Sequence, residues 1–177
     1  MNLPNKLSIL RVICIPVIVI LLYMKGDACR IAAGILFILA SLTDFLDGYI
    51  ARKHQLITDF GKFIDPVADK LLVLTTLIML LHLGLTEAWV VIIVLSRELA
   101  VDGLRLVAVT QGKVIAASSL GKIKTTCQMI LIIATILLNT AGFSSWYMIV
   151  LTVLAVCMTL YSAVDYFVRN RAVFSSR

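Results

Sequence analysis

Four aspartates lie within 26 residues of a chain that is otherwise mostly apolar: Asp44, Asp47, Asp65 and Asp69. A carboxylate at the centre of a membrane helix costs about 3 kcal/mol, so such residues need a function or a partner. Asp44 and Asp47 share one face of a helix, and Asp65 and Asp69 lie one turn apart on the next. Four carboxylates that repel one another remain ionised only if cations lie among them. We therefore predict a site for divalent metal ions.

The residues around the aspartates indicate what such a site would do. Oxygen ligands favour Mg²⁺, Mn²⁺ or Ca²⁺ over zinc, and two neighbouring metals suit in-line displacement at phosphorus. Gly48, Ala51 and Gly61 leave room for a ligand or for a close approach of helices, and Arg52 offers a planar fork for phosphate. In an alternative interpretation, the acids form interhelical ion pairs or a proton or cation pathway. Their number and spacing favour a paired-metal site beside a phosphate clamp.

The rest of the chain has the composition of a membrane protein. Of its 177 residues, 61% are hydrophobic and 15% charged, whereas soluble domains are about 45–50% apolar. We predict an all-α polytopic membrane protein with one domain over residues 1–177 and six transmembrane helices of roughly 20 residues each. Pro4 is expected to open a short N-terminal interfacial helix. The apolar runs predict helices at 5–24, 28–52, 60–85, 88–110, 119–141 and 145–168.

The lysines and arginines predict the orientation of these helices. If the N-terminus is cytoplasmic, only Lys25 and Arg30 of the 16 cations fall in outer loops. Three others lie too deep in the predicted helices to count: Lys70, Arg97 and Arg105. Because the remaining eleven lie on one side, we expect both termini in the cytoplasm. The short connection after residue 52 predicts that the second and third helices are antiparallel neighbours, with the aspartates near the cytoplasmic interface.

The spaced pattern around the aspartates resembles the complete signature of the CDP-alcohol phosphatidyltransferases. It reads Asp44-x-x-Asp47-Gly48-x-x-Ala51-Arg52, eight residues, then Gly61-x-x-x-Asp65-x-x-x-Asp69. Three further segments resemble the branch of that family that uses glycerol 3-phosphate: "NLPNKLSILR" at 2–11, "SRELAVDGLR" at 96–105 and "LGKIKT" at 120–125. The resemblance therefore extends over nearly the whole chain.

The resemblance implies a membrane enzyme, often a homodimer, that uses two divalent metal ions, Mg²⁺ or Mn²⁺. Such enzymes transfer a phosphatidyl group from CDP-diacylglycerol to an alcohol and release CMP. All four aspartates would bind the metals, Asp65 and Asp69 would be catalytic, and Asp69 is the proposed general base. The cell (inner) membrane of a bacterium is the implied location, with the site facing the cytoplasm. The implied CDP-diacylglycerol pocket consists of Gly48, Ala51, Arg52, Gly61, Pro4 and Asn5.

A second polar cluster bears on the acceptor alcohol. It consists of Arg97, Glu98, Asp102 and Arg105, followed by Lys122 and Lys124. One interpretation pairs the arginines with the two acids as internal ion pairs. The cluster still has surplus positive charge, which suits an acceptor that carries its own phosphate. Glycerol 3-phosphate and inositol phosphate both fit, and the resemblance favours glycerol 3-phosphate, held by Arg97, Arg105, Lys122 and Lys124.

Pro66 constrains the third predicted helix at Asp65. Asp65 precedes Pro66, and a residue before proline is disfavoured in the α conformation. The third helix therefore either starts near Asp65 or kinks there.

Overall fold

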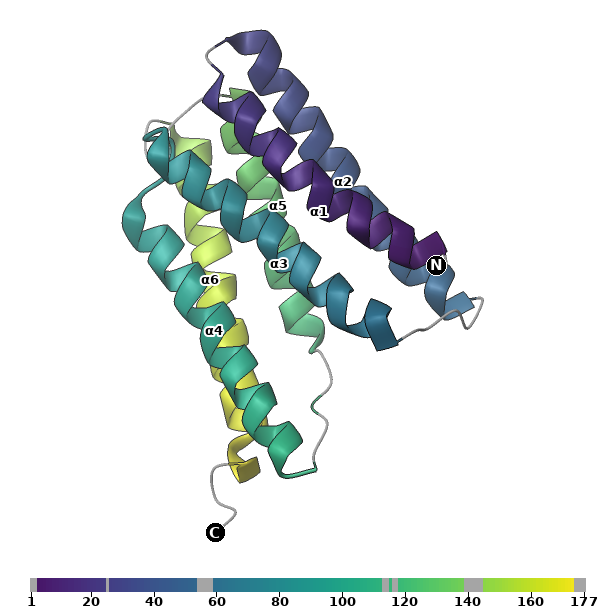
Figure 1. The fold of residues 1–177 in the computed structure, drawn as a ribbon. Coiled ribbons are helices and arrows are strands. Elements are labelled where there is room, and N and C mark those ends of the chain that lie inside the picture. Colours follow the sequence, from purple (N-terminus) through teal and green to yellow (C-terminus); the bar gives the residue numbers. More distant parts are fainter. Residues whose placement is uncertain are drawn as a thin grey trace.

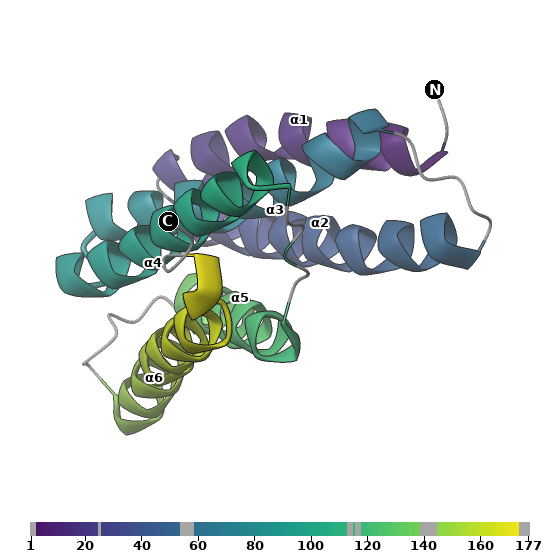
Figure 2. The same cartoon turned by 90° about the horizontal axis from the view of Figure 1, so that it is seen from below.

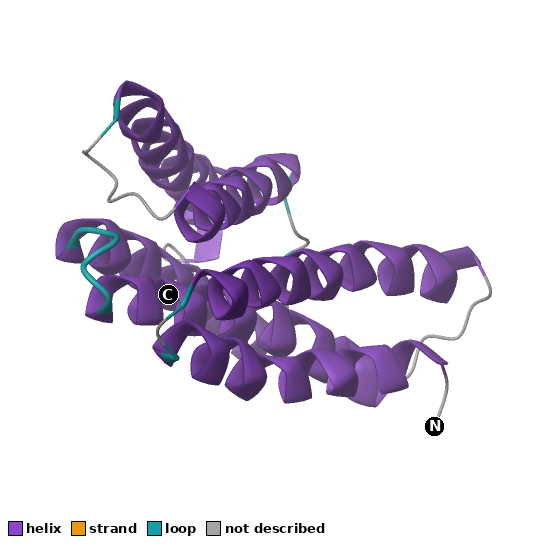
Figure 3. Cartoon of the chain, turned by 90° about the horizontal axis from the view of Figure 1, so that it is seen from above, coloured by secondary structure: helices purple, strands orange, loops and turns teal. Residues whose placement is uncertain are grey.

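The computed structural model describes residues 3–24, 26–53, 59–112, 115, 118–138 and 145–173. Within these ranges the chain forms six α-helices and one short 3₁₀ helix, and no strand (Figures 1 and 3). The all-α prediction is confirmed, and each α-helix boundary lies within three residues of its predicted place. The helices are α1 (Leu3–Tyr23), α2 (Asp27–Lys53), α3 (Asp59–His82), α4 (Ala88–Thr110), α5 (Ser119–Leu138), α6 (Trp146–Arg169) and η1 (Arg171–Val173).

Two predictions about prolines are corrected by the structure. α1 is one continuous helix from Leu3, so a separate interfacial helix is wrong. Pro4 lies in its first turn, where a missing N–H costs no intrahelical hydrogen bond. α3 begins at Asp59 and contains Pro66, so a helix start near Asp65 is also wrong.

Helix α1 is the main packing partner of both aspartate-bearing helices. It contacts α2 and α3 more extensively than these two contact each other. The prediction that α2 and α3 are antiparallel neighbours is confirmed, since they contact each other (Figure 1), and α1 in addition packs on both. α5 packs on α6, and α4 packs mainly on α6. Figure 2 shows α5 and α6 on one side of the molecule and α1 and α3 on the other.

The outer surface of the bundle is apolar on every helix. Large hydrophobic side chains are exposed along all six, whereas soluble monomers rarely expose extended apolar patches. Among the described residues, α5 and α6 are each long and apolar enough to cross a membrane. Exposed examples, one from each helix, are Ile13, Ile35, Ile78, Ile92, Ile130 and Val164.

The interior contains both an apolar core and charged groups. The main apolar core is formed by residues of all helices from α1 through α5 and includes Ile18, Phe37, Leu72 and Ile132. In Figure 1 the odd-numbered helices run upward from their starts and the even-numbered helices run back downward. The start of α1 and the end of α2 lie at the right, and the ends of α4 and α6 lie lower (Figure 1).

Candidate active site

A cavity of about 250 Å³ lies between α3, α4, α5 and α6. All four residues predicted to hold the acceptor phosphate line it, together with Asp69. The cationic side chains that line the cavity are Lys70, Arg97, Arg105, Lys122 and Lys124. The carboxylates are Asp69 and Glu98, and the neutral polar side chains include Ser118, Thr125, Gln128 and Tyr166. Among the residues whose side chains are described, five cations line the cavity against two carboxylates, which suits a phosphate-bearing ligand.

Asp65 and Asp69 are the two aspartates of the predicted metal site whose side chains the structure describes, and they project from consecutive turns of α3. Asp69 lines the cavity, and Asp65 lies one turn nearer the helix start. The hydroxyl of Ser8, fully buried on α1, donates a hydrogen bond to Oδ1 of Asp65. α1 therefore orients a carboxylate of the predicted metal site.

The remaining members of the predicted metal and nucleotide sites lie outside the residues whose side chains the structure describes. They are Asp44, Asp47, Gly48, Ala51, Arg52, Gly61, Pro4 and Asn5. Over the described side chains, no group of three His, Cys, Asp or Glu residues could hold a metal ion. Asp65 and Asp69 supply carboxylate oxygens, the donors that Mg²⁺ and Mn²⁺ prefer. Asp65 and Asp69 therefore provide the kind of ligand atom that these ions bind.

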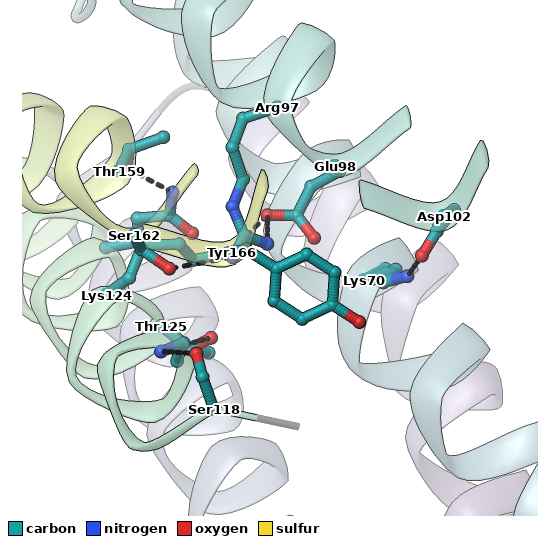
Figure 4. A network of polar contacts seen from close by, with 12 residues as sticks. Lys70, Arg97, Glu98, Asp102, Ser118, Lys124, Thr125, Thr159, Ser162 and Tyr166 are labelled. Atoms are coloured by element: carbon teal, nitrogen blue, oxygen red, sulfur yellow. Dashed lines mark hydrogen bonds and ion pairs between the residues drawn. The ribbon is translucent and has the colours of Figure 1, made fainter. Parts of the chain in front are cut away.

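A buried ion-pair network joins α4, α5 and α6 at the cavity wall (Figure 4). Glu98 Oε1 accepts hydrogen bonds from Arg97 Nη1 at 3.2 Å and from Lys124 Nζ. Arg97 Nη2 also donates to Ser162 Oγ at 2.8 Å. Arg97 therefore forms an internal ion pair with Glu98, as one interpretation of the sequence predicted. It also lines the cavity, where the other interpretation predicted that it binds the acceptor phosphate.

Arg105, the other arginine of the cluster, does not have the acidic partner that the ion-pair interpretation gave it. Arg105 Nε donates to the Tyr166 hydroxyl at 2.8 Å, and its guanidinium carbon lies 5.5 Å from the centre of that ring. Asp102 instead pairs with Lys70 on α3. An Arg105–Asp102 pair is therefore wrong, because Asp102 is paired across to α3 while Arg105 is paired to α6.

The first turn of α5 brings its lysines to the cavity. The Ser118 hydroxyl accepts a hydrogen bond from the Gly121 backbone N–H at 3.1 Å, which caps the start of this helix. A Cβ on Gly121 would lie 3.9 Å from Arg97 Nη2 and 3.4 Å from Ser118 Oγ. The absence of a side chain at Gly121 therefore leaves space in the cavity beside the Arg97 guanidinium.

Several polar residues of the cavity were not predicted from the sequence: Lys70, Ser118, Thr125, Gln128 and Tyr166, together with Ser162, which accepts a hydrogen bond from Arg97. A signal for the last two was present in α6. Its buried polar residues Thr152, Thr159, Ser162 and Tyr166 are spaced by seven, three and four, which places them along one helical face. Gln128 faces this stripe and donates from Nε2 to Thr159 Oγ1 at 2.9 Å.

Comparisons with known proteins show which family the chain is similar to. The model of the family described as CDP-alcohol phosphatidyltransferase matches residues 1–161. A CDP-diacylglycerol–glycerol-3-phosphate 3-phosphatidyltransferase of Bacillus subtilis (strain 168) is 43% identical, over 96% of this chain and 95% of its own. The enzyme of that name from Rickettsia typhi is 39% identical, over 98% and 99%. A probable phosphatidylglycerophosphate synthase of Mycobacterium tuberculosis (strain H37Rv) is 39% identical, over 95% and 81%. The chain belongs to the CDP-alcohol phosphatidyltransferase family.

Proposed function

We propose that the chain transfers a phosphatidyl group from CDP-diacylglycerol to glycerol 3-phosphate. The products are phosphatidylglycerophosphate and CMP. The main support for the proposal is the cavity, which is lined by Asp69 and by five cationic side chains from α3, α4 and α5. The printed names of the relatives from Bacillus subtilis and Rickettsia typhi support the same reaction.

The acceptor's phosphate binds at the cationic wall of the cavity. The Nε of Arg105 donates a hydrogen bond to the Tyr166 hydroxyl, which leaves the Nη groups of Arg105 for a phosphate. Lys122 and Lys124 approach from α5, and Arg97 from α4. A phosphate held here directs the free primary hydroxyl of glycerol 3-phosphate toward Asp69.

The four aspartates hold two divalent metal ions in this proposal. When bound, such ions would stabilise the charge on the oxygens that attack and leave the phosphorus. Ser8 contributes by fixing the orientation of Asp65. Gly48, Ala51, Arg52 and Gly61, with Pro4 and Asn5, form the pocket for CDP-diacylglycerol.

The reaction itself is a substitution at the phosphorus next to diacylglycerol. The acceptor's hydroxyl oxygen forms the new bond to phosphorus, and the bond from phosphorus to the oxygen of the CMP leaving group breaks. The Asp69 carboxylate accepts the hydroxyl proton. A carboxylate is a weak base, and a bound divalent ion would help by lowering the pKa of the alcohol.

The enzyme acts from within the membrane. We place all six helices across the bilayer of the bacterial inner membrane, with both termini and the cavity toward the cytoplasm. The apolar exterior of every described helix supports this placement, and so does the cation distribution in the sequence. A lipid donor can then keep its acyl chains in the bilayer while the soluble acceptor enters from water. The family resemblance further favours a homodimer.

The test measures CMP release by the purified protein in detergent with CDP-diacylglycerol and one candidate acceptor at a time. Glycerol 3-phosphate should support turnover, and glycerol should not. Inositol phosphate is the alternative acceptor, because the cationic wall suits its phosphate equally well. Turnover with inositol phosphate alone would keep the chemistry but change the substrate. Absence of CMP release with every acceptor would refute the proposal.

A further inference from the structure

Glu98 is a buried carboxylate that two cations of the cavity share. Its Oε1 accepts from Arg97 Nη1 at 3.2 Å and from Lys124 Nζ. The side chains of Glu98, Arg97 and Lys124 are only 8%, 8% and 4% exposed. All three line the cavity. Figure 4 shows how their side chains lie relative to one another. Because a buried charge without a partner is strongly unfavourable, Glu98 keeps both cations in place when no ligand is bound.

Among the described ion pairs, those of Arg97 and Lys124 both go to Glu98. Among the described residues, Lys70 has its own counter-ion, Asp102, which does not line the cavity. Arg105 is held by the neutral hydroxyl of Tyr166. Arg97 is also anchored by Ser162 at 2.8 Å, so it can stay in place when its bond to the carboxylate weakens.

We infer that Glu98 is the internal counter-ion of the acceptor cavity, and that an acceptor phosphate competes with it for Arg97 and Lys124. This inference rests on the proposed function, because it takes the phosphate to bind at those cations. An uncharged alcohol gains little from cations that are already neutralised. A dianionic phosphate gains enough to share them. Glu98 is therefore a specificity-determining residue that makes phosphate a condition for acceptor binding.

The test replaces Glu98 with glutamine, which has nearly the same shape but no charge. The probe is inorganic phosphate, added to the full-length protein in detergent without divalent metal or CDP-diacylglycerol. Thermal unfolding is followed, with sodium chloride at equal ionic strength as the reference. Without phosphate, Glu98→Gln should unfold at a lower temperature than the wild type. Phosphate should raise its midpoint more than that of the wild type, with an apparent dissociation constant at least fivefold lower.

Asp27→Asn provides the matched control. Asp27 is also paired with an arginine, Arg30, at 2.8 Å, but its side chain is 82% exposed and does not line this cavity. The substitution removes the same charge from the protein at the opposite end of the bundle. Its apparent dissociation constant for phosphate should stay within twofold of the wild-type value.

Each outcome bears on the inference. If Glu98→Gln cannot be purified folded in chloride, inorganic phosphate during purification should restore the folded protein, because an anion replaces the missing carboxylate. Absence of that rescue overturns the inference. So does a folded Glu98→Gln protein that binds phosphate no more tightly than the wild type. If the wild type still releases CMP with glycerol 3-phosphate in that case, the proposed function stands and only the role of Glu98 is lost.

Discussion

Replacing Arg105 with glutamine tests whether the cavity binds the acceptor's phosphate. In the structure the guanidinium of Arg105 is fixed by Tyr166, with Nε 2.8 Å from the hydroxyl. A hydrogen bond to a charged group contributes about 1.5–3 kcal/mol. Glutamine cannot form the bidentate contact. We therefore expect the KM for glycerol 3-phosphate to rise at least tenfold, which corresponds to about 1.4 kcal/mol.

Two comparisons make this prediction specific. Tyr166→Phe keeps the ring beside Arg105 but removes the hydroxyl that fixes it. Because the guanidinium itself remains, its KM should rise by less, about threefold, which corresponds to roughly 0.7 kcal/mol. Lys122→Gln should act in the same direction as Arg105→Gln but more weakly, because an ammonium is a point charge without a fork.

The assay is CMP release with one substrate varied while the other is saturating, together with a thermal midpoint for each variant. The KM for CDP-diacylglycerol should change little, because that substrate is assigned to Arg52 and the aspartates. If Arg105→Gln raises both KM values equally, the phosphate-binding role of Arg105 is wrong and the clamp lies elsewhere.

Three further predictions concern the aspartates, the metals and the ion-pair network. Replacing Asp44, Asp47, Asp65 or Asp69 with asparagine removes a metal ligand, so each variant should lose most CMP release while the amount of folded protein in membranes is unchanged. Near-normal turnover in two of the four variants would rule out the paired-metal site. A chelator should abolish turnover and added Mg²⁺ or Mn²⁺ should restore it, and full activity in the chelator is incompatible with the proposal. Arg97→Gln should lower the thermal midpoint, because it removes bonds to Glu98 and Ser162; an unchanged midpoint would contradict a structural contribution from Arg97.

The helices could be predicted from the sequence because local signals specify them. Long apolar runs fix their lengths, and turn residues fix their ends. Gly84 and Gly112 follow α3 and α4 with φ of +71° each, a conformation that glycine adopts without strain. Gly112 lies just beyond the predicted fourth helix, whereas Gly84 lies inside the predicted range 60–85, and α3 ends three residues earlier than predicted. The predicted bounds of the fourth helix, 88–110, are those of α4.

The partners across helices could not be predicted in the same way. Spacing shows that Arg105 and Asp102 lie on nearby parts of one helix, but not which neighbouring helix each contacts. Arg105 and Tyr166 are 61 residues apart, and Lys70 and Asp102 are 32 apart. The same limit applies to α1: a short connection predicts contact between α2 and α3, whereas only packing shows that a third helix contacts both.

The burial of Arg11 has a consequence for how the protein enters the bilayer. This side chain lies in α1 and is 1% exposed, and its Nε donates to the backbone oxygen of Ala40 on α2 at 3.3 Å. An arginine at the centre of a membrane helix costs about 3 kcal/mol if it must insert without its neighbours. The ribosome makes α1 before α2, so the bond from Arg11 to α2 forms only once Ala40 has been synthesised. We therefore expect the first two helices to leave the insertion machinery together as a hairpin, before α3 arrives to complete the bundle around them.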